Sequence, residues 1–265
     1  MLSIVFGSMI GIILGLTGAG GGILAVPALV LGMGLNMAQA APIALMAVGT
    51  AALLGALDGL RKGLVRYKAA LLMAGLGSIV SPVGMWVAHR VSTMWLMTLF
   101  SLVMLLVAWR MLQQVRTGSR LQNAAVNQHK PCMINPATHK LYWTWKSSSI
   151  LAFIGSVSGL FTGMLGVGGG FLIVPAFKHF SNISMHGIVA TSLMVIALIS
   201  ASSVAGALFS GVHVPAEGWH FIAAAAGGML VGRQVAPALP EKWLQTGFAA
   251  ITVVVSLMLI ARTYL

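Results

Sequence analysis

The chain has 265 residues, of which 58% are hydrophobic and 7% are charged. A soluble domain carries about a quarter charged residues, so this composition excludes a water-soluble globular protein and predicts an integral membrane protein. The formal charge of +12 does not indicate nucleic-acid binding, because the basic residues lie in short loops between apolar segments, as is usual in membrane proteins.

Eight apolar segments follow one another along the chain. They cover residues 2–32, 37–60, 69–88 and 92–112, and then 148–177, 184–211, 217–236 and 243–262. A spanning helix needs about 20 apolar residues, so all but the first and fifth segments fit single crossings. The predicted fold class is an all-α polytopic membrane protein with about eight transmembrane segments. The first ten residues lack a basic stretch and a small-residue cleavage site, so we expect the first segment to be retained.

The first and fifth segments carry the same glycine-rich motif. It reads GAGGGILAVP at 18–27 and GVGGGFLIVP at 166–175. The same offset of 148 residues relates Gly11 to Gly159, Gly84 to Gly232, Trp95 to Trp243 and Phe100 to Phe248. This self-similarity predicts two tandem four-segment repeats, each with a glycine-broken helix at its start. The expected boundaries are 1–112 for the first repeat, 113–147 for a polar, basic connector, and 148–265 for the second repeat.

The broken segments leave two topologies open. If they cross the membrane, the halves run parallel, and this eight-segment count is our working prediction. If they turn back, the halves are inverted, as in many carriers. The turn-back arrangement would add Lys178, Arg233 and Lys242 to the side that carries the connector. Both arrangements place the connector 113–147 in the cytoplasm, because it lies on the more basic side.

The paired breaks predict a binding site for a small anion. Unpaired backbone groups cost several kcal/mol in lipid, so broken backbone persists only where protein buries it or where it lines a cavity. A half-helix that starts after each break, near Pro27 and Pro175, would direct free N–H groups and a positive dipole end at a ligand. The candidate binding residues are Thr17, Gly18, Gly20, Gly21, Gly22, Thr162, Gly166, Gly168, Gly169, Gly170, Thr191 and Ser192. The alternatives are close helix packing through glycines and hydroxyls that bond their own helix.

Charged and metal-binding side chains add little to this site. Asp58 precedes Arg61 by three residues, and an interfacial ion pair is preferred over a proton-coupling carboxylate. Arg233 either attracts an anion or extends from its segment end to the membrane surface. The central loop holds His129, Cys132 and His139, whose spacing matches no zinc pattern, so neither a metal nor a cofactor is predicted. The chain also lacks the motifs of hydrolases and P-loop enzymes, so we expect no enzyme activity.

The doubled glycine motif, four apolar segments per half and a basic central loop resemble the TauE/SafE family of sulfite exporters. The resemblance covers nearly the whole chain. It implies a secondary transporter in a bacterial-type inner membrane, with alternating access around the breaks and sulfite or an organosulfonate as the anion. Coupling to protons or another ion, the direction of transport and the oligomeric state stay open. The alternatives are an uncoupled, channel-like conduit and a non-transport membrane subunit that docks a partner through the connector.

Overall fold

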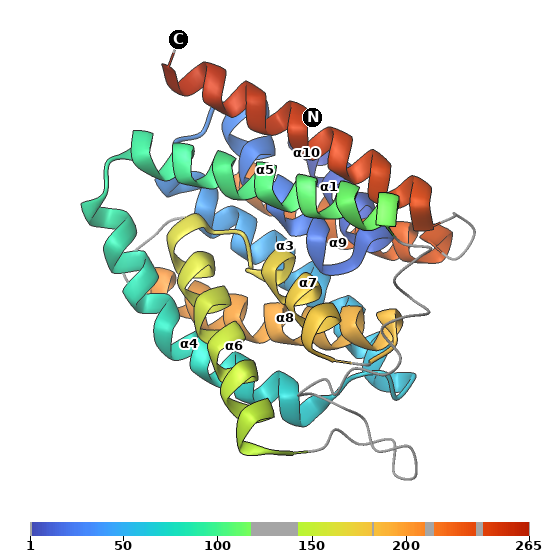
Figure 1. The fold of residues 1–265 in the computed structure, drawn as a ribbon. Coiled ribbons are helices and arrows are strands. Elements are labelled where there is room, and N and C mark those ends of the chain that lie inside the picture. The colour runs from blue at the N-terminus through green and yellow to red at the C-terminus, as the bar shows by residue number, and fades with distance from the viewer. Residues whose placement is uncertain (1, 118–142, 182, 210–214, 237–240, 265) are drawn as a thin grey trace.

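The computed structural model describes all residues except 1, 118–142, 182, 210–214, 237–240 and 265, so most of the predicted connector lies outside the described residues. The described residues form helices throughout, as expected (Figure 1). The first half contains α1 (Leu2–Thr17), η1 (Gly18–Leu24), α2 (Ala25–Pro27), η2 (Ala28–Gly32), α3 (Met37–Arg61), α4 (Tyr67–Arg90) and α5 (Thr93–Thr117). The second contains α6 (Trp145–Leu165), α7 (Gly170–Phe180), α8 (Met185–Phe209), α9 (Ala216–Val235) and α10 (Glu241–Tyr264).

Six helices among the described residues are long and apolar enough to cross a membrane. They are stretches of α3, α4, α5, α6, α8 and α10. The remaining apolar helices are shorter or less hydrophobic, and they include α1 and α7, which flank the two glycine motifs. The chain is therefore a multi-pass membrane protein. The eight-segment count is not reproduced by the described helices.

The two halves interlock instead of packing side by side. Helix α1 packs against α9, and α6 packs against α4 in the same way, so the first helix of each half contacts the other half. Helices α3 and α8 pack on each other, as do α5 and α10 (Figure 1). The 148-residue offset relates the α1–α9 contact to the α6–α4 contact. It also relates α3 to α8 and α5 to α10, so each of these two contacts joins equivalent helices of the two halves. The repeat boundaries at residues 112 and 147 stay a prediction, because the two repeats interlock and do not form separate bodies in space.

Glycines make the close contacts between the interlocked helices. Gly11 in α1 lies against the backbone of Ala225 in α9, and Gly159 in α6 lies against the backbone of Gly77 in α4. These two contacts are related by the 148-residue offset. Small residues let membrane helices approach backbone to backbone, so the glycine stripes in the sequence select the helix partners.

The residue pairs also set the directions of the helices. Along α4 and α8, Gly77 contacts Ile199, and Ser81 shares a hydrogen bond of 2.7 Å with Ser203, so the two helices run the same way. Gly155 of α6 meets Met73 of α4, and Gly159 meets Gly77 one turn further on, so α6 runs in the same direction as α4. Helices α6 and α8 are therefore parallel, and α7 between them must carry the chain back.

The first half turns back in the same manner. Helix α1 runs parallel to α9, since Gly7, Gly11 and Gly15 meet successive turns of α9 in rising order. Gly55 late in α3 meets Met229 and Arg233, as Gly15 late in α1 does, so α3 ends on the side where α1 ends. The stretch from η1 to η2 therefore returns the chain, and Gly32 at its end lies against Phe6 near the start of α1. This order of directions corresponds to the turn-back alternative with inverted halves. The chain turns back because the glycine faces of α1 and α6 pack along helices of the opposite half, α9 and α4.

Side-specific labelling of His179→Cys distinguishes the two topologies. The variant is made in a Cys132→Ser background, which removes the single native cysteine. In the turn-back arrangement, positions 179 and 61 lie on one side and position 92 on the other. We expect a membrane-impermeant maleimide to label His179→Cys and Arg61→Cys from the same side and Ser92→Cys from the opposite side. Labelling of His179→Cys from the Ser92 side would restore the crossing model.

Candidate functional site

A cavity of about 860 Å³ lies between the two halves. Its lining combines the last turn of α1 and the first glycine break with residues just after α3, the C-terminal half of α5 and the end of α9. The first turns of α8 and α10 and most of α7 complete it. Because of the helix directions, all these helix ends lie on the side from which α5 leaves for the connector. A volume of this size is typical of small-molecule binding pockets, which range from about 300 to 1,000 Å³.

Basic side chains gather in the cavity. Lys62, Arg110, Lys178, His179, His186 and Arg233 belong to its lining, whereas the remaining lining is mainly apolar. Of the three acids of the chain, the structure describes the side chains of Asp58 and Glu217, and neither is among the lining residues. Clefts lined by one sign of charge raise the local concentration of the opposite ion. The cavity is therefore suited to draw in an anion.

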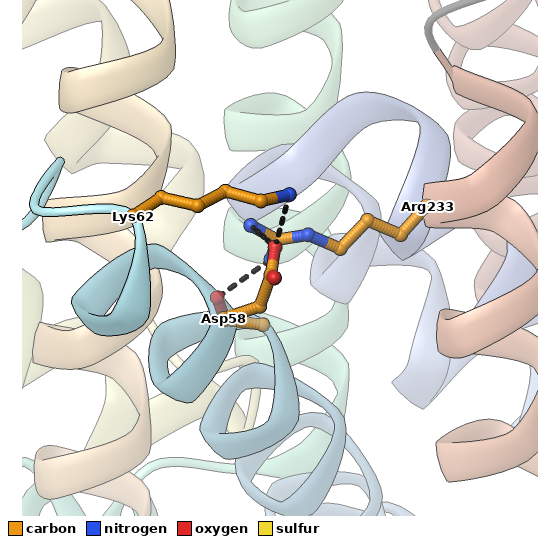
Figure 2. A network of polar contacts seen from close by, with 4 residues as sticks. Asp58, Lys62 and Arg233 are labelled. Carbon is orange, nitrogen blue, oxygen red and sulfur yellow. Dashed lines mark hydrogen bonds and ion pairs between the residues drawn. The ribbon is translucent and has the colours of Figure 1, made fainter.

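One acid, Asp58, joins two of these basic residues (Figure 2). Lys62 Nζ lies 2.9 Å from Asp58 Oδ2, and Arg233 Nη2 lies 2.7 Å from the same oxygen. Arg233 also donates through Nη1 to the carbonyl oxygen of Gly55, at 2.6 Å. The cluster thus ties the last turns of α3 to the end of α9. Its side chains stay partly exposed, at 61% for Lys62, 37% for Asp58 and 25% for Arg233.

Two expectations about these charges are corrected. The predicted partner of Asp58 was Arg61, but the carboxylate binds Lys62 one residue further along the helix and Arg233 from α9. Of the two alternatives for Arg233, the extension to the membrane surface is not what the structure has, because its guanidinium binds Gly55 and Asp58 of α3. Both errors have one cause: α9 packs against α3 of the opposite half, and its position in the sequence does not indicate that neighbour.

The first glycine break lines the cavity. Helix α1 ends at Thr17, Gly18 takes a left-handed φ of +72°, and tight 3₁₀ turns follow. Thr17, Gly18 and Gly20 are lining residues. Gly21 and Gly22 are buried instead, Gly21 against the backbone of Leu14 and Gly22 against Val48. Only part of the predicted first cradle is thus open to a ligand in this structure.

The second break is closed by packing. Gly166, Gly168 and Gly169 all have positive φ, which glycine accepts at little cost and which ends α6 sharply. Together with Gly170 they are buried and absent from the cavity lining, and Ser158 Oγ donates to the carbonyl of Gly169 at 3.1 Å. The two breaks meet in the interior, where Gly22 approaches the carbonyl oxygen of Val167.

The expected positions of the two prolines at half-helix starts are only partly correct. Helix α7 begins at Gly170, so Pro175 lies beyond its first turn. Its N-terminal N–H groups therefore belong to the buried second break. In the first half, Pro27 lies inside a continuous helical stretch, Gly20–Gly32, that is built of 3₁₀, α and π turns, so this half-helix starts at the glycine break and not at the proline.

The predicted hydroxyl residues are dispersed. Thr17 and Thr162 donate to carbonyls one turn earlier, those of Ile13 and Ser158, both at 2.7 Å. Thr191 donates to Gly187 and accepts the Arg66 backbone N–H at 3.0 Å. The Ser192 hydroxyl is fully buried and has no hydrogen-bond partner among the described residues. Of the four, only Thr17 lines the cavity, and the structure does not bring Thr191 or Ser192 to it.

Reasoning from the sequence omitted most of the basic lining. Arg110, Lys178, His179 and His186 were not among the candidate binding residues, although each lies near a segment end. The signal that could have found them is the charge count of the turn-back topology, which moves Lys178 and Arg233 to the connector side. Among the described residues, no group of three or more His, Cys, Asp or Glu could hold a metal. His129, Cys132 and His139 lie outside that part of the chain.

Known proteins resemble this chain in sequence. The family model described as sulfite exporter TauE/SafE matches residues 3–259. A protein of Xylella fastidiosa (strain Temecula1 / ATCC 700964) named "Probable membrane transporter protein" is 30% identical over 191 residues, which is 72% of this chain and 67% of that protein. Its namesake in X. fastidiosa strain 9a5c is 29% identical over the same length. No solved structure matches the chain.

Proposed function

Since this chain belongs to the sulfite exporter TauE/SafE family of membrane transporters, we propose that it is a secondary transporter that carries sulfite or an organosulfonate. The substrate enters the cavity as an anion and reaches the paired glycine breaks. The observation that carries the proposal is the cavity itself, because it connects the basic side of the molecule with Thr17, Gly18 and Gly20.

The chemistry of the lining supports an oxyanion as cargo. Lys62, Arg110 and Arg233 supply positive charge, and Gly20 has no side chain between the cavity and its backbone. Backbone N–H groups at a helix break bind an oxyanion without a charged partner, so the anion is held but can leave again. A cluster of cations without counter-ions at membrane depth would bind the anion more tightly and release it slowly. A basic entrance that leads to a neutral backbone site therefore suits a transporter, which must release its substrate.

The inverted pairing supports alternating access. The contacts of α1 with α9 and of α6 with α4 are related by the repeat offset, so the two breaks occupy equivalent positions in the two halves. In this structure the first break lines a cavity and the second is packed. Exchange of the two environments by rocking of one half would open the second break and close the first. The connector would lie in the cytoplasm and the protein in an inner membrane, with no enzyme activity of its own.

Flux in proteoliposomes tests the proposal. We expect purified protein to take up radiolabelled sulfite with saturable kinetics and to accelerate uptake when the vesicles are preloaded with unlabelled sulfite. Such exchange requires a carrier that returns loaded, which an uncoupled conduit does not do. Non-saturating uptake without acceleration by preloading would favour the conduit. No flux of sulfite, sulfoacetate, taurine, thiosulfate or sulfate by folded protein would contradict the proposal.

A further inference from the structure

We propose that Arg233 and Lys62 form a first oxyanion-binding site at the cavity wall, before the glycine break, and that Asp58 occupies this site as an internal counter-ion until the substrate displaces it. The ligand class is an oxyanion head group, either a sulfonate-type or a carboxylate group. The inference rests on the proposed function, because it names the residues that recognise the transported anion.

The geometry of the cluster supports this assignment. Both cations converge on one carboxylate oxygen, Asp58 Oδ2, at 2.9 Å from Lys62 Nζ and 2.7 Å from Arg233 Nη2. A sulfonate or carboxylate oxygen placed there would meet the same two donors. Lys62 and Arg233 line the cavity, but Asp58 does not, so an incoming anion reaches the cations from the cavity.

Arg233 is anchored so that it keeps its place when Asp58 leaves. Its Nη1 donates to the carbonyl oxygen of Gly55, at 2.6 Å, while Nη2 faces the carboxylate. Gly55 permits this approach, since a β-carbon at that position would lie 2.8 Å from Nη1. The guanidinium therefore has one donor bound to the backbone and another directed at the anion position, which is a preorganised arrangement.

The related helix pair of the other half shows that the fold does not need these charges. Helices α8 and α4 pack as α3 and α9 do. The residues that correspond to Asp58 and Arg233 through the 148-residue offset are Gly206 and Met85. One pair of helices thus packs with a charged cluster and its counterpart packs without one. The cluster is therefore a specific feature of the cavity side and not a requirement of the helix crossing.

Anion binding to four purified proteins tests the proposal. The probes are sulfite, sulfoacetate and acetate, with affinity measured by calorimetry and supported by thermal shift. If Asp58 holds Arg233 in about nine molecules of ten, Asp58→Asn tightens the apparent affinity about tenfold. Arg233→Gln is expected to lose at least that factor. Arg61→Gln removes a neighbouring cation outside the cavity lining and should bind as the unmodified protein does.

The double variant Asp58→Gly/Arg233→Met separates binding from folding. It copies the residues of the related helix pair, so it should fold and insert but bind no probe. The affinities for sulfite and sulfoacetate, compared with the affinity for acetate, show which head group the site prefers. If the unmodified protein binds or transports an anion while Asp58→Asn and Arg233→Gln leave its affinity unchanged, the inference fails and the proposed function stands. If neither the unmodified protein nor Asp58→Asn binds any probe, both are overturned.

Discussion

Gly20→Val is expected to abolish transport while the protein still folds and inserts. Gly20 lines the cavity, and a β-carbon there would lie 3.7 Å from the ring of Phe248, an ordinary contact distance. Its φ is not among the positive values of the glycines, so a side chain causes no backbone strain. The two valine methyl groups would instead occupy the space next to the backbone that an anion needs. We expect flux to fall by about two orders of magnitude, the scale of a lost preorganised anion contact.

A graded series at position 20 provides the control. Gly20→Ala adds only the β-carbon for which there is room and should keep part of the flux, whereas Gly20→Leu should be as inactive as Gly20→Val. Fluorescence-detected size exclusion and the thermal midpoint verify folding. The equivalent break residue Gly168 is a poorer test, because its φ is +77° and a β-carbon would lie 3.0 Å from Ile196. Normal flux through inserted Gly20→Val would contradict a substrate path along the first break.

The largest loss of stability is expected from Gly159→Ala. A β-carbon on Gly159 of α6 would overlap the carbonyl oxygen and Cα of Gly77 on α4. Helix backbone cannot rotate away as a side chain can, so the two helices must separate along their whole contact. Overpacking of this kind costs about 1–3 kcal/mol in a packed core. At about 2–4 °C for each kcal/mol, the thermal midpoint in detergent should fall by on the order of 5 °C.

Gly75→Ala is the matched control on the same helix pair. Gly75 lies in α4, two residues before Gly77, and a β-carbon there would meet nothing within 4 Å. The substitution makes the same chemical change in the other helix of the same pair, and a helix interior tolerates alanine better than glycine. Its midpoint should therefore stay unchanged or rise slightly. Equal midpoints for Gly159→Ala and Gly75→Ala would show that the α4–α6 crossing is looser than the structure has it.

Much of this protein could be predicted from its composition and its internal repeat. An apolar chain with three acids cannot cover a water-facing surface, and this determined the membrane class. The GxGGG motifs, with positive φ at Gly18 and Gly166, do end α1 and α6, because only glycine takes that conformation readily. The offset between the motifs also relates the contacts of the folded chain, as the Gly11–Ala225 and Gly159–Gly77 crossings illustrate.

The site was less predictable, because its residues come from helices that are far apart in the sequence. Arg233 and Asp58 are separated by most of the chain, and they meet only because α9 packs against α3. Within the motif itself, Gly20 and Gly168 are equivalent in sequence but differ in surroundings, one lining a cavity and the other packed among Val48 and Ile196. The sequence repeat predicts equal surroundings for these two glycines. They differ in the structure because the cavity is open at the first break and not at the second.

The sequence by itself therefore determined the membrane class, the repeat and the places where the helices break. These properties depend on hydrophobic length and on local backbone conformation, which each residue carries with it. Only the tertiary structure decided that the broken segments turn back, that the halves interlock, and that Lys62, Arg110 and Arg233 face one cavity. Those features depend on which glycine stripe packs against which backbone, and the choice is made by the fit of helices that are distant in the chain.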